Sequence, residues 1–178
     1  MIRVGYRGYE TAKLVKDKRF DNNMKNATAA GVKVGAYIVT QAVNTNEAVE
    51  EASFIISACK SYSVSLPLAI DVESAGNGTG RGDKISVSER TAVINAFVQT
   101  VKNSGYSAMV YANKDWMTNK INAGSLVQEV MSGWHNTEAA AHMEEVIRCG
   151  SLQIQARYLG LQDMWMSVRG NIKRMTNL

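Results

Sequence analysis

The sequence is poor in the residues that mark several classes of protein. It has two cysteines and two histidines among 178 residues, and Cys59 lies far from Cys149. This excludes a disulfide framework and a cysteine-based metal site, and we expect Cys59 to be a small buried hydrophobe. No apolar run approaches the roughly 18 residues of a membrane span, and the first residues lack the apolar core of a signal peptide. We therefore expect neither a membrane segment nor a signal peptide within this chain.

The chain also lacks a strong charge of one sign. Its formal net charge of +4 comes from 20 basic and 16 acidic residues that are spread along the sequence. No basic stripe interleaved with aromatic residues is present, which argues against nucleic-acid binding. The length and the 46% hydrophobic content are typical of a globular protein with a sizeable core.

What the sequence does contain is a repeated strand-then-helix pattern. Four apolar, β-compatible segments alternate with helical patterns of roughly 10 to 15 residues. These segments are residues 2–6, 32–39, 68–72 and 108–112. Strands that are apolar nearly throughout are buried on both faces, as in parallel sheets. The pattern predicts an α/β fold, either a barrel or a doubly wound sheet.

Two of the expected helices begin with a recognisable signal. Asn44 is followed three residues later by Glu47, and Ser86 is followed three residues later by Glu89. Both pairs have the spacing of a capping box, in which the two residues satisfy each other's backbone N–H groups. We therefore expect helices to begin at these positions.

The most informative residues for function are Asp71 and Glu73, in the segment Ile-Asp-Val-Glu. Alternate residues of a strand point to the same side, so the two carboxyl groups should face together. They lie at the C-terminal end of a buried strand, where α/β barrels and open α/β sheets place their active sites. Two neighbouring acids repel each other, and at least one should have a raised pKa, as a general acid needs near neutral pH. The pair indicates hydrolysis of a glycosidic bond.

Two other interpretations of this pair stay open. The carboxylates could accept hydrogen bonds from amides of the following glycine-rich loop, residues 74–84, and serve the fold alone. They could also hold a divalent cation, although no histidine lies nearby. The loop itself lacks the lysine and hydroxyl spacing of a phosphate-binding loop, and we interpret its tripeptide Arg81-Gly82-Asp83 as a solvated turn.

Five further side chains are candidates for substrate binding. Tyr37 and Tyr111 lie near the ends of their strands, where each ring would either stack against a sugar or pack in the core. Arg3 lies in an otherwise apolar strand and would either orient a carboxylate or form a structural ion pair, which we favour. Gln41 and Asn113 follow the strands that carry the two tyrosines and would support a cleft there.

In order and spacing, several segments resemble the lysozymes of glycoside hydrolase family 25. They are IRVGYRGY, AAGVKVGAYIVTQAVN with EAVEEASF, LPLAIDVE with its GNG loop, AFVQTVKNSGY and VYANKDW, within residues 2–126. The resemblance implies a TIM-like barrel and cleavage of the bond between N-acetylmuramic acid and N-acetylglucosamine in peptidoglycan. It implies Glu73 as the general acid/base. Asp71 would stabilise positive charge, or orient the 2-acetamido group if that group is the internal nucleophile.

The resemblance also implies partners and a location. We expect a monomer that binds peptidoglycan glycan strands, without a cofactor, a metal, nucleic acid or a membrane. It would act outside the cytoplasm at the cell wall, and would come from a bacterium or a phage. Two alternatives from other classes stay open, namely a non-catalytic module that binds wall sugars and a gene product without function.

Two stretches depart from the family pattern. The family begins with a strand that bears an active-site aspartate, and this chain starts inside the second strand. Residues 127–178 lack the late motifs of the family, whose final strand carries Val-Asp. Met and Trp each have a single codon, so only one DNA sequence can encode Met164-Trp165-Met166. Read in the frame that begins at the third base of these codons, that DNA encodes Val-Asp. We therefore expect an incomplete barrel of strands two to five in residues 1–126, a frame-shifted tail at 127–178, and impaired activity.

Overall fold

The structure, a computed structural model, describes residues 1–126, and the predicted frame-shifted tail at 127–178 lies outside this part. A five-stranded sheet with the order β2-β1-β3-β4-β5 forms its centre. The strands are β1 (Ile2–Arg7), β2 (Leu14–Lys16), β3 (Ala36–Val39), β4 (Leu68–Val72) and β5 (Ala108–Ala112). All neighbours pair in parallel except β1 and β2, which form an antiparallel pair.

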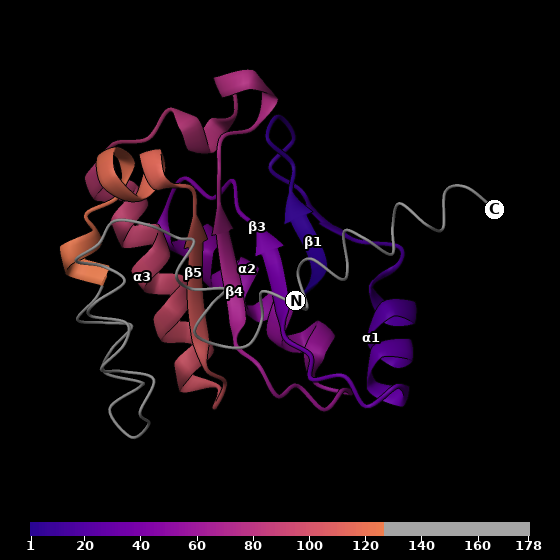
Figure 1. The fold of residues 1–178 in the computed structure, drawn as a ribbon. Coiled ribbons are helices and arrows are strands. Elements are labelled where there is room, and N and C mark those ends of the chain that lie inside the picture. Colours follow the sequence, from indigo (N-terminus) through magenta and orange to yellow (C-terminus); the bar gives the residue numbers. More distant parts are fainter. Residues whose placement is uncertain (127–178) are drawn as a thin grey trace. The chain divides into compact units, whose positions relative to one another are not determined.

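Three α-helices connect the parallel strands in turn. They are α1 (Phe20–Ala29), α2 (Thr45–Cys59) and α3 (Val87–Asn103). Helix α2 packs against β1 and β3, α3 packs against β4 and β5, and the two helices contact each other, so they cover the same face (Figure 1). The parallel strands follow in chain order without reversal, as in a barrel, whereas a doubly wound sheet reverses its order. The predicted α/β class with TIM-like winding is confirmed.

Three short helical turns lie in the loops after the strands. The loop after β4 contains η1 (Gly76–Gly78) and η2 (Arg81–Asp83), and the chain after β5 forms the π-helical turn η3 (Trp116–Lys120). These loops follow the C-terminal ends of neighbouring parallel strands. They therefore lie at the edge of the sheet where α/β proteins bind ligands.

The two faces of the sheet differ in composition. Ile38, Ile70 and Val110 are register partners in β3, β4 and β5, and all three belong to the buried apolar cluster. Residues from α2 and α3, including Ile55 and Phe97, belong to the same cluster. Since side chains alternate along a strand, the residues between these positions point to the opposite face. That second face carries Asp71.

Two predicted segments differ in extent from the observed strands. The third strand in space, β3, begins at Ala36 instead of residue 32, and Val32 is 44% exposed. The carbonyl oxygen of Val34 instead accepts backbone hydrogen bonds from Ser65 and Leu66, both at 2.9 Å. Strand β2 was not predicted, because three residues are too short to show a hydrophobic period.

The predicted helix caps are present in one complete and one partial form. At α3, the Ser86 hydroxyl accepts from the Glu89 N–H at 3.2 Å, and the Glu89 carboxylate accepts from the Ser86 N–H at 2.8 Å. At α2, Asn44 accepts from the Glu47 N–H at 3.0 Å. The Glu47 carboxylate accepts instead from the Val43 N–H at 2.9 Å, so the capping box is only half formed.

The cap of α3 gives a first testable expectation. Ser86→Ala should lower the free energy of unfolding by about 1 kcal/mol, because the Glu89 N–H loses its acceptor at the helix start. Urea denaturation measures this difference. Ser63→Ala, the same change at an exposed loop position, is the control and should have a much smaller effect. Equal effects of the two substitutions would contradict the assigned cap.

Candidate active site

The carboxyl group of Asp71 lies on the sheet face opposite the helices, at the C-terminal end of β4. Asp71 pairs with Val39 of β3 and with Tyr111 of β5, and it is 8% exposed. Glu73 follows directly after the last residue of β4 and is half-buried. The spacing of two residues sends both side chains toward the same side of the sheet.

Burial sets the protonation of Asp71. Burial, and to a smaller extent the negative charge of Glu73, together raise the pKa of Asp71 to about 7. The prediction that at least one member of the pair has a raised pKa is confirmed. Among residues 1–126, no loop amide donates a hydrogen bond to either carboxylate, and Asp71 Oδ1 has no hydrogen-bond partner. The geometry therefore favours a chemical use over a purely structural one.

Both predicted tyrosines lie on the same face as the carboxyl groups. Tyr111 is the direct register partner of Asp71, and Tyr37 pairs with Ala69, two residues earlier in β4. Both tyrosines are half-buried. Burial raises the pKa of Tyr37, and the negative charges of Asp71 and Glu73 raise it as well. The two rings thus border the carboxyl pair.

Tyr6 is a neighbour of the site that the sequence analysis did not single out. It pairs with Val39, which pairs with Asp71, so Tyr6 belongs to the same row across the sheet. Its side chain is 39% exposed. An irregularity in the register between Arg3 and Gly5 breaks simple alternation along β1. Reading every second residue of β1 therefore does not reveal that Tyr6 belongs to this row.

The other three candidates make hydrogen bonds or ion pairs within the described part of the chain. Arg3, with a side chain that is 46% exposed, forms an ion pair with Asp17 at 2.8 Å. Asn113 accepts a hydrogen bond from the Trp116 N–H at 2.9 Å, at the start of η3. The side chain of Gln41 is buried and contacts the backbone of the loop after β4.

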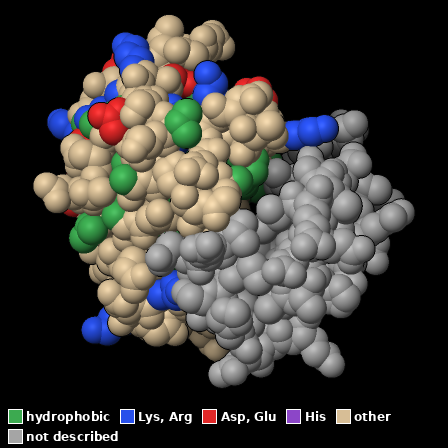
Figure 2. Space-filling view, turned by 90° about the vertical axis from the view of Figure 1, so that its left-hand side faces the viewer, with side chains coloured by type: hydrophobic (Ala, Val, Ile, Leu, Met, Phe, Trp, Pro, Cys, Tyr) green, Lys and Arg blue, Asp and Glu red, His purple; other side chains and the backbone are tan. Residues whose placement is uncertain are grey.

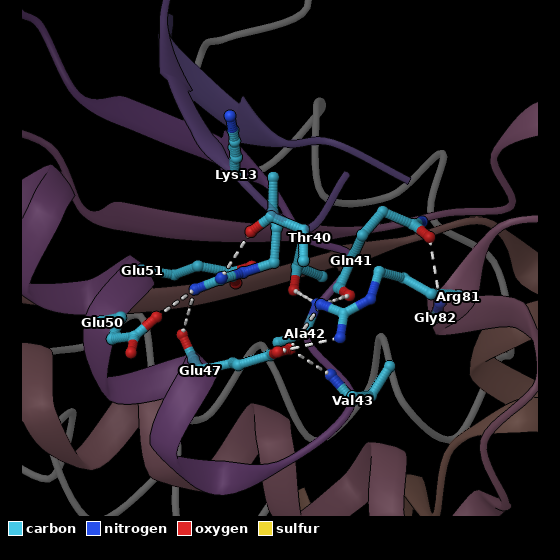
Figure 3. A network of polar contacts seen from close by, with 12 residues as sticks. Lys13, Thr40, Gln41, Ala42, Val43, Glu47, Glu50, Glu51, Arg81 and Gly82 are labelled. Carbon is cyan, nitrogen blue, oxygen red and sulfur yellow. Dashed lines mark hydrogen bonds and ion pairs between the residues drawn. The ribbon is translucent and has the colours of Figure 1, made fainter. Parts of the chain in front are cut away.

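The tripeptide at 81–83 is not a solvated turn, and that prediction is wrong. Arg81 forms a two-fold ion pair with Glu47 at 2.7 and 2.9 Å, and Gly82 is buried (Figure 3). Asp83 accepts a hydrogen bond from the Ala75 N–H at 3.0 Å. These contacts fold the segment back onto α2 and the loop, which composition alone does not show.

Another feature that sequence reasoning missed is a buried ion pair between β1 and α2. Arg7 at the end of β1 donates to Glu51 at 2.8 Å and to Glu50 at 3.0 Å, both on α2. Glu51 is fully buried, and burial raises its pKa while Arg7 opposes that shift. The burial of Glu51 was predictable, because it lies on the apolar face of α2 beside Ala48 and Ala52, but its distant partner Arg7 was not.

Charge is dispersed over the surface of the described part. On the face shown in Figure 2, Lys and Arg side chains are spread out, with acidic side chains among them. Within residues 1–126, no cluster of three or more histidine, cysteine or acidic side chains has the arrangement of a metal site. Each helix of this part is too short or too polar to span a bilayer.

Comparison with solved structures finds three proteins with the same fold. The modular autolysin LytC of Streptococcus pneumoniae, also solved with a synthetic peptidoglycan ligand, has 24% identity and a TM-score of 0.59. The spore cortex lytic enzyme SleM of Clostridium perfringens has 21% identity and a TM-score of 0.56. The CTP1L endolysin has 20% identity and a TM-score of 0.52. At these identities the likeness concerns the fold.

The shared region is most of this chain and a minority of the others. It covers 72% of this chain and 29% of LytC, 66% of this chain and 38% of SleM, and 68% of this chain and 38% of the endolysin. The comparison with curated proteins gives no match. The family model of Glycosyl hydrolases family 25 matches residues 10–142. Because this match spans more than half of the chain, the protein belongs to glycosyl hydrolase family 25.

Proposed function

We propose that this protein hydrolyses the glycosidic bond between N-acetylmuramic acid and N-acetylglucosamine in peptidoglycan. The carboxyl pair at the end of β4 carries the proposal, since the pKa of Asp71 is raised to about 7 beside Glu73. Glycosidases use two such groups, held in different protonation states by their surroundings. Membership of family 25 supports the same chemistry.

In the free protein the proton of the pair is on Asp71 below about pH 7. In this proposal substrate binding leaves Asp71 ionised and the proton on Glu73, which is the general acid/base. Glu73 donates a proton to the glycosidic oxygen as the bond to the anomeric carbon breaks, and the leaving sugar departs as an alcohol. The acetamido oxygen of the remaining sugar attacks the anomeric carbon, forming a cyclic oxazolinium ion. Water then adds to that carbon, and its proton returns to Glu73. Asp71 in its ionised form orients the acetamido group and stabilises the positive charge.

The substrate contacts follow from the arrangement around the pair. We assign sugar stacking to the half-buried rings of Tyr37 and Tyr111, which border the carboxyl groups on the same face. We assign supporting roles at the edge of the cleft to Arg3, Gln41 and Asn113. Residues 1–126 form the catalytic part in this proposal, and the substrate places its action outside the cytoplasm, at the cell wall.

Product analysis tests the proposed reaction. The full chain is incubated with purified peptidoglycan from a Gram-positive wall, and new reducing ends are measured and identified by mass spectrometry. Products with N-acetylmuramic acid at the reducing end support the proposal, and we expect slow turnover because the described sheet is open at β2 and β5. Reducing ends on N-acetylglucosamine would contradict it. Co-sedimentation with peptidoglycan without product would identify a sugar-binding module instead.

A further inference from the structure

The amide of Gln41 bridges two backbone groups of the loop after β4. Its Nε2 donates to the carbonyl oxygen of Glu73 at 3.3 Å, and its Oε1 accepts from the Gly82 N–H at 3.0 Å. The residue is only 3% exposed, so water does not compete for these bonds. Figure 3 shows the side chain reaching from the end of β3 to Gly82.

This bridge begins where the sheet ladder ends. The last backbone hydrogen bond from this end of β3 to β4 runs from the Thr40 N–H to the carbonyl oxygen of Asp71, at 2.9 Å. Glu73 lies beyond it and outside the strand. Within residues 1–126, the Gln41 amide is the hydrogen-bonding group that holds the main chain of Glu73. The direction of the chain at Glu73 therefore depends on a side chain.

The other end of the bridge is fixed to a helix. Arg81, the residue before Gly82, forms a two-fold ion pair with Glu47 on the first turn of α2, and its Nη1 lies 3.4 Å from the carbonyl oxygen of Gln41. The two side chains are 24% and 17% exposed. A partly buried pair with two parallel hydrogen bonds has a defined geometry. The position of Gly82 relative to α2 and to the end of β3 is therefore fixed.

The glycines of the loop make room for this bridge. A Cβ atom at Gly80 would lie 2.6 Å from Gln41 Oε1, and one at Gly82 would lie 3.2 Å from the same oxygen. The φ of Gly80 is −57°, which any residue can adopt, so the requirement at this position is space. Glycine at positions 80 and 82 therefore leaves the space that the Gln41 amide occupies.

We propose that Gln41 is a positioning residue, which fixes the main chain at Glu73 and thereby holds the Glu73 carboxyl group beside Asp71. The ion pair between Arg81 and Glu47 fixes the far end of the bridge. The kinetic part of this inference rests on the proposed hydrolysis. The geometric part concerns the distance between two carboxyl groups and is measurable without turnover.

The test replaces Gln41 with Met, which has a similar length and makes neither hydrogen bond. Hydrolysis of peptidoglycan should show a kcat reduced by about 100-fold with KM little changed, because a misplacement of about 1 Å has an effect of this size. The pKa of Asp71, followed by carbon NMR of labelled aspartate, should drop below about 7 as the Glu73 charge moves away. Gln99→Met, at an exposed position of α3, is the matched control and should change neither quantity.

The two readouts separate the two proposals. An Asp71 pKa that stays unchanged in folded Gln41→Met protein overturns the positioning role, whether or not the protein hydrolyses peptidoglycan. A wild-type chain without hydrolysis overturns the proposed function, and the titration still decides the role of Gln41. If Gln41→Met does not fold by circular dichroism, Gly82→Ala displaces the same amide by a few tenths of an ångström, and the same titration decides.

Discussion

Glu73→Gln is expected to lower the rate of peptidoglycan hydrolysis by about 10²- to 10⁴-fold, the range that general acid/base groups contribute. The amide has nearly the shape of the carboxyl group but cannot donate and recover a proton at neutral pH. Loss of turbidity of a Gram-positive cell-wall suspension measures the rate. Sugar binding should persist, because the tyrosines beside the carboxyl pair are unchanged.

The matched control for this substitution is Glu10→Gln. It makes the same change in charge at an exposed position outside the carboxyl pair, and it should leave the rate unchanged. Full activity of the Glu73→Gln variant would show that Glu73 is not the general acid/base. The proposed roles of the carboxyl pair would then be wrong, while the family assignment would stand. Equal loss in both variants would indicate an effect of net charge on binding to the wall.

Asp71→Asn is expected to stabilise the fold at high pH and to leave it nearly unchanged at low pH. Burial, with the Glu73 charge beside it, raises the pKa of Asp71 from 3.8 in the unfolded chain to about 7 in the folded state. The folded protein therefore keeps a proton that the unfolded chain has lost. The stability contributed by this proton is fully present below pH 3.8 and is lost as the pH rises through about 7.

The size of the effect follows from the same two values. Each pH unit between 3.8 and about 7 contributes about 1.36 kcal/mol, which gives about 4 kcal/mol in total. The difference in unfolding free energy between variant and wild type, measured by urea denaturation, should grow by about this amount from pH 3.5 to pH 8. Asp115→Asn makes the same change at an exposed position, and it is the control that should change the unfolding free energy much less. A difference for Asp71→Asn that is constant with pH would show that Asp71 ionises normally in the folded protein.

Local signals predicted part of this fold well. The apolar run of β4, the capping box of α3 and the two-residue spacing of the carboxyl groups each depend on residues close in sequence. Such patterns can be recognised in a short segment, because the alternation of a strand and the hydrogen bonds of a helix cap involve residues close in sequence. The position of the carboxyl pair at the end of β4 was therefore predictable from the sequence.

Other features depend on partners far along the chain and were not predictable in this way. The pair between Arg7 and Glu51 joins residues 44 positions apart, and the bond from Gln41 to Glu73 joins residues 32 apart. Nothing in the neighbourhood of Gln41 shows that its amide will be buried against a loop. The glycines at 80 and 82 suggest flexibility in the sequence, whereas in the structure they allow close packing.

The loop after β4 has two parts with different freedom to change. Residues 80–83 are tied to Gln41, to Glu47 and to the Ala75 N–H, whereas residues 77–79 are exposed at the tip. Extra residues inserted at this tip would lengthen the loop without loosening the attachment of Glu73, because both ends of the insertion are already secured. If the protein acts on a polymer as proposed, an insertion at this tip would change how much of the polymer beyond the cleaved bond the loop can contact, while the carboxyl pair stays in place.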